Sequence, residues 1–321
     1  MDSKYLLSAL LVLSLCASIS RAQEFRVAQT DVFTPQHKKI LLLKDRRSHR
    51  KIILFQTNLR VNTDGTPLSY HPQDPRGRTL AINTVCNGFA VRRVGSRDNL
   101  CLKRATYEEA IGVFERFRDS NYQPVPGYEI RWQNVVAAIK ENGREVPCIF
   151  KSGDFKGYFG SLTHLRNDIT GDKGECEIKD QVDPLEVPAL VLTGGEHAVK
   201  AFGANIGDLL IAYNPGTQLF TSAIIGDSGP PDNLGEGSVL LNMKLLGTTT
   251  LPKNKPETYD LSIEDTKVLI AIIPGSRHFN VAKPYTAENI EQRFNDWRAE
   301  AGFTTPEKLI ELMKSFQPRL N

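Results

Sequence analysis

The chain has 321 residues, and its 40 basic and 37 acidic side chains leave a formal net charge of +3. This length allows one large domain or two small ones with a sizeable core. The near-neutral total excludes the strongly basic profile that is typical of nucleic-acid-binding proteins.

Residues 1–22 have the pattern of a secretory signal peptide. Lys4 precedes an apolar run at residues 5–15, and Ser20-Arg21-Ala22 before Gln23 has the small residues of a cleavage site. The run is too short for a comfortable membrane span. We therefore expect a secreted protein that is cleaved after Ala22 and has no membrane span.

Charged residues are unevenly distributed along the rest of the chain. Residues 38–51 hold seven basic side chains and one acid, whereas residues 167–187 hold seven acids and two lysines. No Lys or Arg occurs from residue 201 to residue 243. This local acidity favours a cationic partner over a phosphate or a nucleic acid, although a charge run can also be a simple solvated face.

The predicted elements follow in chain order. Residues 23–50 are expected to be a basic arm with a strand near residues 40–43, and the compact domain is expected to run from the apolar segment 51–56 to residue 321. Periodicity and turn residues predict short strands at 88–93, 148–151, 157–163, 187–193, 208–213, 218–225 and 267–273. They predict helices at 107–117, 135–140, 239–247, 287–301 and 304–316. The sequence therefore predicts a mainly β protein of the α+β class, with a β-barrel core and with inserted and C-terminal helices.

Four cysteines follow the signal peptide: Cys86, Cys101, Cys148 and Cys176. An even number in an exported protein predicts two disulfides, and four cysteines allow three pairings. We favour the nearest neighbours, Cys86 with Cys101 and Cys148 with Cys176. No closely spaced set of His and Cys residues is present, so a structural zinc site is not expected.

The stretch from residue 222 to residue 247 carries the strongest chemical signal. Asp227 follows an apolar run, and Glu236 precedes the helix predicted at 239–247. Nine extended residues would span roughly 30 Å, but the Gly and Pro residues in and around the loop fold it back. Inverting glycosidases need two carboxyl groups roughly 6.5–9.5 Å apart, a separation that such a loop can set. Turn and helix-capping roles explain the same two residues without catalysis.

The surroundings of the two carboxyl groups predict different roles. Desolvation at the end of an apolar strand favours a protonated Asp227 as the general acid. The dipole of the following helix favours an ionised Glu236 as the general base. The reverse assignment stays open.

Residues 226–230, Gly-Asp-Ser-Gly-Pro, also resemble the nucleophile segment of trypsin-like serine proteases. Those proteins need a base histidine in an Ala-Ala-His-Cys setting and a second glycine after the serine, and the chain has neither. His164 and His197 both lack that context. A hydrolase with Ser228 as the nucleophile remains an alternative.

The order and spacing of several segments resemble the glycoside hydrolase family 75 chitosanases. The matching segments are residues 62–65, 157–163, 187–192, 207–213, 225–230, 234–238 and 273–276. The resemblance implies endo-acting hydrolysis of β-1,4-linked glucosamine polymers with inversion, by an Asp and a Glu that fall on Asp227 and Glu236. It also implies that no metal or organic cofactor is needed. Thr63 and Gly237 depart from the family's usual residues.

The strand, the Asp-x-Gly-Pro loop and the helix also resemble double-psi β-barrels of wall-acting proteins, some of which bind glycans without cleaving them. We therefore expect a double-psi-like core, with a non-catalytic or differently specific glycan-binding protein as the alternative function. Asp64, Asp208 and Asp232 are candidates to pair with substrate ammonium groups, although Asp208 can equally be a turn residue. Tyr158 is a candidate to stack on a sugar ring. The expected partner is a cationic, chitosan-like polysaccharide, and the expected state is a monomer.

Overall fold

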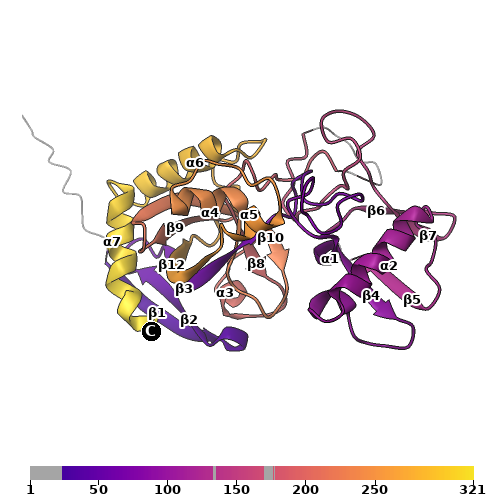
Figure 1. Ribbon diagram of the computed structural model, residues 1–321. Coiled ribbons are helices and arrows are strands. Elements are labelled where there is room, and N and C mark those ends of the chain that lie inside the picture. Colours follow the sequence, from indigo (N-terminus) through magenta and orange to yellow (C-terminus); the bar gives the residue numbers. More distant parts are fainter. Residues whose placement is uncertain (1–23, 133–134, 170–175, 177) are drawn as a thin grey trace, which may run out of the picture.

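The computed structural model describes residues 24–321, except for residues 133–134, 170–175 and 177. The signal peptide predicted at residues 1–22 lies outside the described residues. Figure 1 shows a barrel flanked by helices and, beside it, a lobe made from the segment inserted between two of the barrel strands. None of the helices in the described residues is long and apolar enough to cross a membrane.

The core is a closed barrel of six strands. In spatial order these are β3 (Lys51–Asn62), β11 (Glu236–Ser238), β8 (Ala189–Thr193), β10 (Leu219–Gly229), β9 (Leu209–Asn214) and β12 (Ile263–Ile272). Antiparallel pairing of β12 with β3 closes the barrel. The mainly β, α+β architecture with a barrel core and added helices is therefore confirmed.

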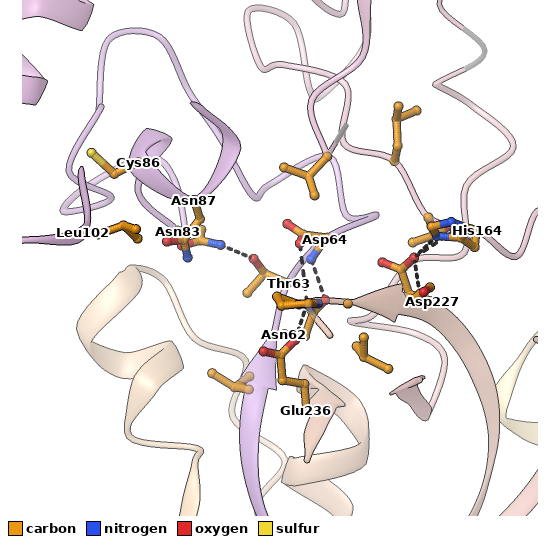
Figure 2. A pocket seen from close by; sticks show the side chains of 18 residues that line it. Asn62, Thr63, Asp64, Asn83, Cys86, Asn87, Leu102, His164, Asp227 and Glu236 are labelled. Atoms are coloured by element: carbon orange, nitrogen blue, oxygen red, sulfur yellow. Dashed lines mark hydrogen bonds and ion pairs between the residues drawn. The ribbon is translucent and has the colours of Figure 1, made fainter. Parts of the chain in front are cut away.

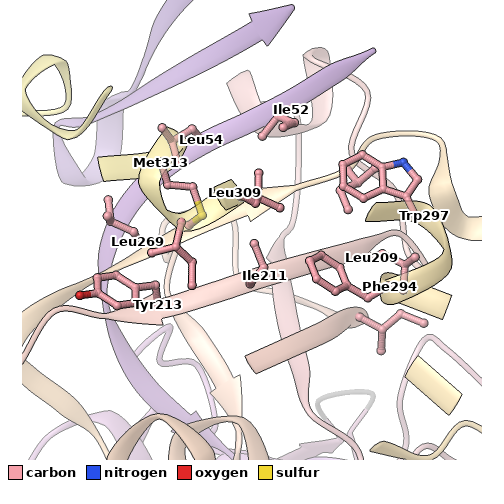
Figure 3. Packing of buried hydrophobic residues seen from close by; sticks show 14 of the residues in the cluster. Ile52, Leu54, Leu209, Ile211, Tyr213, Leu269, Phe294, Trp297, Leu309 and Met313 are labelled. Carbon is pink, nitrogen blue, oxygen red and sulfur yellow. The ribbon is translucent and has the colours of Figure 1, made fainter. Parts of the chain in front are cut away.

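Successive residues of the barrel strands point to opposite faces, as the period of two requires. Ile211 and the other strand residues on its face of the barrel form one apolar cluster with α6 (Ala287–Glu300) and α7 (Pro306–Phe316). These two helices cover the outside of the barrel (Figures 1 and 3). Ala212 and the other strand residues on the opposite, inner face form a second apolar cluster. Residues of α3 (Ala198–Ala201) and α4 (Val239–Leu246) belong to the same cluster. The barrel is thus packed on both faces, which explains why its strands read as nearly continuous apolar runs.

The N-terminal segment belongs to the sheet. It forms a hairpin of β1 (Phe25–Phe33) and β2 (Lys38–Asp45), with the one-turn helix η1 (Thr34–Gln36) between them. β2 pairs with β3, and Leu41 and Leu43 are buried against the outer core. The basic side chains that suggested an arm at residues 23–50 flank the apolar run 40–43, and this run pairs with β3, so the compact fold begins before residue 51.

The inserted lobe joins β3 to β8 and has its own apolar core around Phe89, Phe114 and Phe159. Its elements are α1 (Val85–Gly88), β4 (Phe89–Arg93), η2 (Leu100–Leu102), α2 (Tyr107–Asp119), β5 (Tyr128–Trp132), β6 (Ala138–Glu141) and β7 (Arg144–Pro147). The predicted helix at 135–140 is wrong, because β6 pairs with β7 in a hairpin there. The predicted strands at 148–151 and 157–163 contribute only isolated bridges.

Both expected disulfides are present, Cys86–Cys101 and Cys148–Cys176, and both lie in the inserted lobe. The remaining short helices are α5 (Lys255–Tyr259), η3 (Ser276–His278) and η4 (Gln317–Arg319). The barrel therefore depends on its two apolar clusters, whereas the smaller core of the lobe is reinforced by covalent links.

Candidate active site

A β-bulge in β10 sets the direction of Asp227. Ile225 pairs with Leu190 of β8 and Asp227 pairs with Val191, so Gly226 is an extra residue in the ladder. Strict alternation would turn Asp227 into the barrel together with Ile225, which lies in the inner cluster. The extra residue turns Asp227 to the outer face instead.

Glu236 lies on the other side of the same β8 residue. Val191 pairs with Asp227 on β10 and with Glu236 on β11, so the three residues form one row across three strands. Residues in such a row face the same side of the sheet. Two strand spacings place the Cα atoms of the two acids about 9–10 Å apart.

The row opens into a pocket of about 760 Å³ between the barrel and the inserted lobe. Figure 2 shows Asp64, Asp227 and Glu236 around this space. The lobe contributes Leu102, whose side chain is 80% exposed, and His164. Among the described residues that line the pocket there is no Lys or Arg. The lining of the pocket therefore presents carboxyl groups to a ligand, with one imidazole among them.

The carboxyl group of Glu236 is held by two amides. Asn233 donates to Oε1 at 2.5 Å, and Asn62 donates to Oε2 at 3.5 Å. Burial raises the pKa of Glu236 above its ordinary value, and the nearby charge of Asp227 raises it further. Glu236 belongs to β11, and the helix that follows is capped by Ser238. The environment of Glu236 thus favours the protonated form, contrary to the expectation from the helix dipole.

Asp227 faces hydrogen-bond donors. Its Oδ1 accepts from the backbone N–H groups of His164 at 3.0 Å and Ser228 at 2.8 Å, and it lies 2.7 Å from Nδ1 of His164. The hydrogen bond to Asp227 raises the pKa of His164 above its ordinary value. These contacts fix the orientation of the Asp227 side chain at the pocket.

Asp64 is a third carboxyl group at the pocket, just after the end of β3. The hydroxyl of Tyr70 donates to its Oδ1 at 2.6 Å, and Asn62 donates to its Oδ2 at 3.5 Å. Burial raises the pKa of Asp64 to about 7, and the charges of Asp227 and Glu236 contribute to the rise. Near neutral pH Asp64 therefore keeps its proton in a large share of the molecules.

The other predicted binding residues lie elsewhere. Asp208 is fully buried and accepts from the backbone N–H groups of Asn205 and Arg277, which fits the turn role considered for it. Asp232 is exposed on the loop before β11, and the hydroxyl of Tyr158 donates to the carbonyl of Leu80. None of these three predicted residues is among the described residues that line the pocket.

Sequence reasoning did not assign His164, Asn62 or Asn233 to the site. Asn62 has a weak signal, since it begins the polar segment 62–65 that also contains Asp64. His164 lies 63 residues before Asp227, and no motif links the two. Ser228 is half-buried beside Asp227, and within the described residues no histidine hydrogen-bonds to it, which weakens the serine hydrolase alternative.

Within the described part of the chain, no group of three or more His, Cys, Asp and Glu side chains is arranged to hold a metal ion. No protein-family model matches the sequence, and no curated protein matches it. The chemistry of the pocket therefore carries the functional argument.

Proposed function

We propose that the protein is a secreted, endo-acting glycoside hydrolase that cleaves a β-1,4-linked glucosamine polymer with inversion. The observation that carries the proposal is the row formed by Asp227, Val191 and Glu236 at the floor of one pocket. Inverting glycosidases separate their carboxyl groups by roughly 6.5–9.5 Å, and retaining ones by about 5 Å. The Cα atoms of the two acids lie two strand spacings apart, about 9–10 Å, which leaves room between the side chains for the wider carboxyl separation of an inverting enzyme.

The charge of the pocket supports a cationic glycan. Three carboxyl groups line it, and the described lining residues include no Lys or Arg. Each glucosamine unit carries an ammonium group, which such a pocket attracts. Asp64, which accepts a hydrogen bond from Tyr70, is the candidate partner for that group. The exposed Leu102 and Pro230 offer apolar surface to a sugar ring.

The environments of the two carboxyl groups support a division of labour opposite to that expected from the sequence. Glu236, whose pKa is raised by burial, gives its proton to the glycosidic oxygen as the C1–O bond breaks. Asp227, which His164 orients, acts as the general base and takes a proton from the water that attacks C1 on the opposite face. The result is inversion at C1.

The test measures reducing ends released from highly deacetylated chitosan by the wild type, Asp227→Asn and Glu236→Gln, with colloidal chitin as the control polymer. We expect each substitution to lower kcat by about 10²–10⁴-fold. On a substrate with a good leaving group, Glu236→Gln is expected to recover much of its activity and Asp227→Asn is not. We expect both variants to keep the fold, and thermal unfolding checks this.

Two results would count against this proposal. Equal recovery of the two variants on the activated substrate removes the assignment of acid and base. A wild type that binds chitosan without releasing reducing ends, with Asp227→Ala binding equally well, favours the alternative of a non-catalytic or differently specific glycan-binding protein.

A further inference from the structure

The turn of the N-terminal hairpin contacts the loop that carries Glu236. Gln36, the last residue of η1, donates from Nε2 to Oδ1 of Asn233 at 3.0 Å. Its Oε1 accepts from the backbone N–H of Leu234 at 2.9 Å. Both ends of the Gln36 amide thus form hydrogen bonds with two consecutive residues of the loop. Gln36 and Asn233 are 197 positions apart in the sequence.

The contact with Gln36 fixes which way the Asn233 amide faces. An amide has one oxygen acceptor and one nitrogen donor at its two ends. Because Oδ1 of Asn233 accepts from Gln36, its Nδ2 faces Oε1 of Glu236, to which it donates at 2.5 Å. The opposite orientation would set two oxygen atoms against each other at Glu236. Gln36 therefore acts on Glu236 through Asn233.

The hairpin is held firmly enough to serve as a support. Phe33, just before the turn, is 2% exposed and packs in the inner apolar cluster, which also contains Leu234. The ammonium group of Lys38 donates to the carbonyl of Leu234 at 2.6 Å and to the hydroxyl of Thr57 at 2.5 Å. The turn and the loop are thus joined on both sides of Gln36.

We propose that Gln36 is a positioning residue for the general acid, and that the N-terminal hairpin is the part of the fold that orients Glu236. The inference rests on the proposed function of Glu236, but the hydrogen-bonded chain exists whatever the substrate is. The other ionisable groups around Glu236 come from β10, from β3 and its end, and from α5: Asp227, Arg60, Asp64 and Tyr259. None of them contacts Gln36 among the described residues, so a change at Gln36 leaves them in place.

The experiment compares Gln36→Ala and Gln36→Glu with Gln29→Ala, a matched change at an exposed position of the same hairpin. Glutamate can still accept from Leu234 but no longer donates to Asn233 when ionised. Carbon-13 NMR of carboxyl-labelled glutamate follows the titration of Glu236 without substrate. The hydrogen bond from Asn233 lowers the pKa of Glu236, so its loss in both Gln36 variants is expected to raise that pKa by about 0.5–1 unit.

Activity gives a second readout. In both Gln36 variants we expect kcat on chitosan to fall about tenfold, the alkaline limb of its pH profile to move upward with the pKa of Glu236, and KM to change less than twofold. Gln29→Ala should match the wild type in both readouts. An unchanged titration of Glu236 in the folded Gln36 variants overturns the inference, and so does an equal shift in Gln29→Ala. If the titration shifts but the wild type releases no reducing ends, the proposed reaction fails while the positioning role of Gln36 holds.

Discussion

At the scale of single residues, burial separates the three carboxyl groups that share the pocket. Asp227 is compensated by three donors, Glu236 by two amides, and Asp64 by a tyrosine hydroxyl and one long amide contact. Burial raises the pKa of Asp64 to about 7. A buried carboxyl group with such a raised pKa lowers the stability of the empty protein. Groups of this kind are typical of binding sites.

Asp64→Asn is expected to stabilise the protein in a pH-dependent way. The native pKa of Asp64 is above its ordinary value, so the native state holds this proton more tightly, and the free energy of unfolding falls as pH rises from about 4 to about 7. The variant should therefore be more stable than the wild type by about 1–2 kcal/mol at pH 8, a range that already allows for screening by solvent in the open pocket. At pH 4 the two proteins should be nearly equal in stability.

Urea denaturation at the two pH values measures the difference, with Asp232→Asn as the control because Asp232 is exposed on the loop. A gain that is the same at pH 4 and pH 8 would show that titration of Asp64 is not its cause.

At the scale of elements, the loop between β10 and β11 is held by backbone contacts as well as side chains. Arg60 donates its backbone N–H to the carbonyl of Gly235, and a Cβ at Gly235 would lie 2.3 Å from the carbonyl oxygen of Asn58. Gly235 has φ +129°, a conformation that glycine alone adopts readily. The loop therefore returns to the sheet at a fixed point, next to Glu236.

Ser238 links this return to the neighbouring strand, and its loss is expected to be costly. Its Oγ accepts from the backbone N–H groups of Ala189 and Leu241 and donates to the carbonyl of Val187. Ser238→Ala removes the N-cap of α4 and leaves buried backbone groups unpaired, so we expect the free energy of unfolding to fall by about 2–4 kcal/mol.

Chemical denaturation measures this loss. Ser228→Ala is the matched control, because Ser228 lies half-buried at the rim of the pocket and should change stability by less than about 0.5 kcal/mol. A loss below about 1 kcal/mol in Ser238→Ala would mean that water or a backbone shift replaces these hydrogen bonds.

At the scale of the whole molecule, the pocket depends on two cores that differ in how they are stabilised. The barrel has two large apolar clusters, whereas the lobe has one cluster and both disulfides. Two disulfides are compatible with an extracellular protein. The lobe supplies one wall of the pocket, so its integrity limits binding even when the barrel is folded.

Reduction of the disulfides is expected to loosen the lobe before the barrel. The Cys86–Cys101 link closes a loop of 15 residues, for which chain entropy gives about 3 kcal/mol. After treatment with dithiothreitol, amide hydrogen exchange should accelerate in α2, while β9 and β12 keep their protection. The untreated protein is the reference, and simultaneous loss of protection in the barrel strands would show that the two cores unfold as one unit.

The sequence by itself determined the local features: the apolar strands, the main helices, the pairing of neighbouring cysteines and the loop that carries Asp227 and Glu236. These follow from periodicity, turn residues and short separations, which act within a few residues of each other. The charge count misjudged residues 23–50, because the apolar run 40–43 between the lysines joins the sheet only when β3 is there to pair with it.

Only the tertiary structure decided the direction and environment of the site residues. The bulge at Gly226 turns Asp227 outward because the register of β8 leaves one residue unpaired. His164 and Gln36 reach the loop from 63 and 197 positions away, and Asp208 is removed from the site by burial. Such relations depend on which strands close the barrel, and no pattern within a short stretch of sequence specifies that.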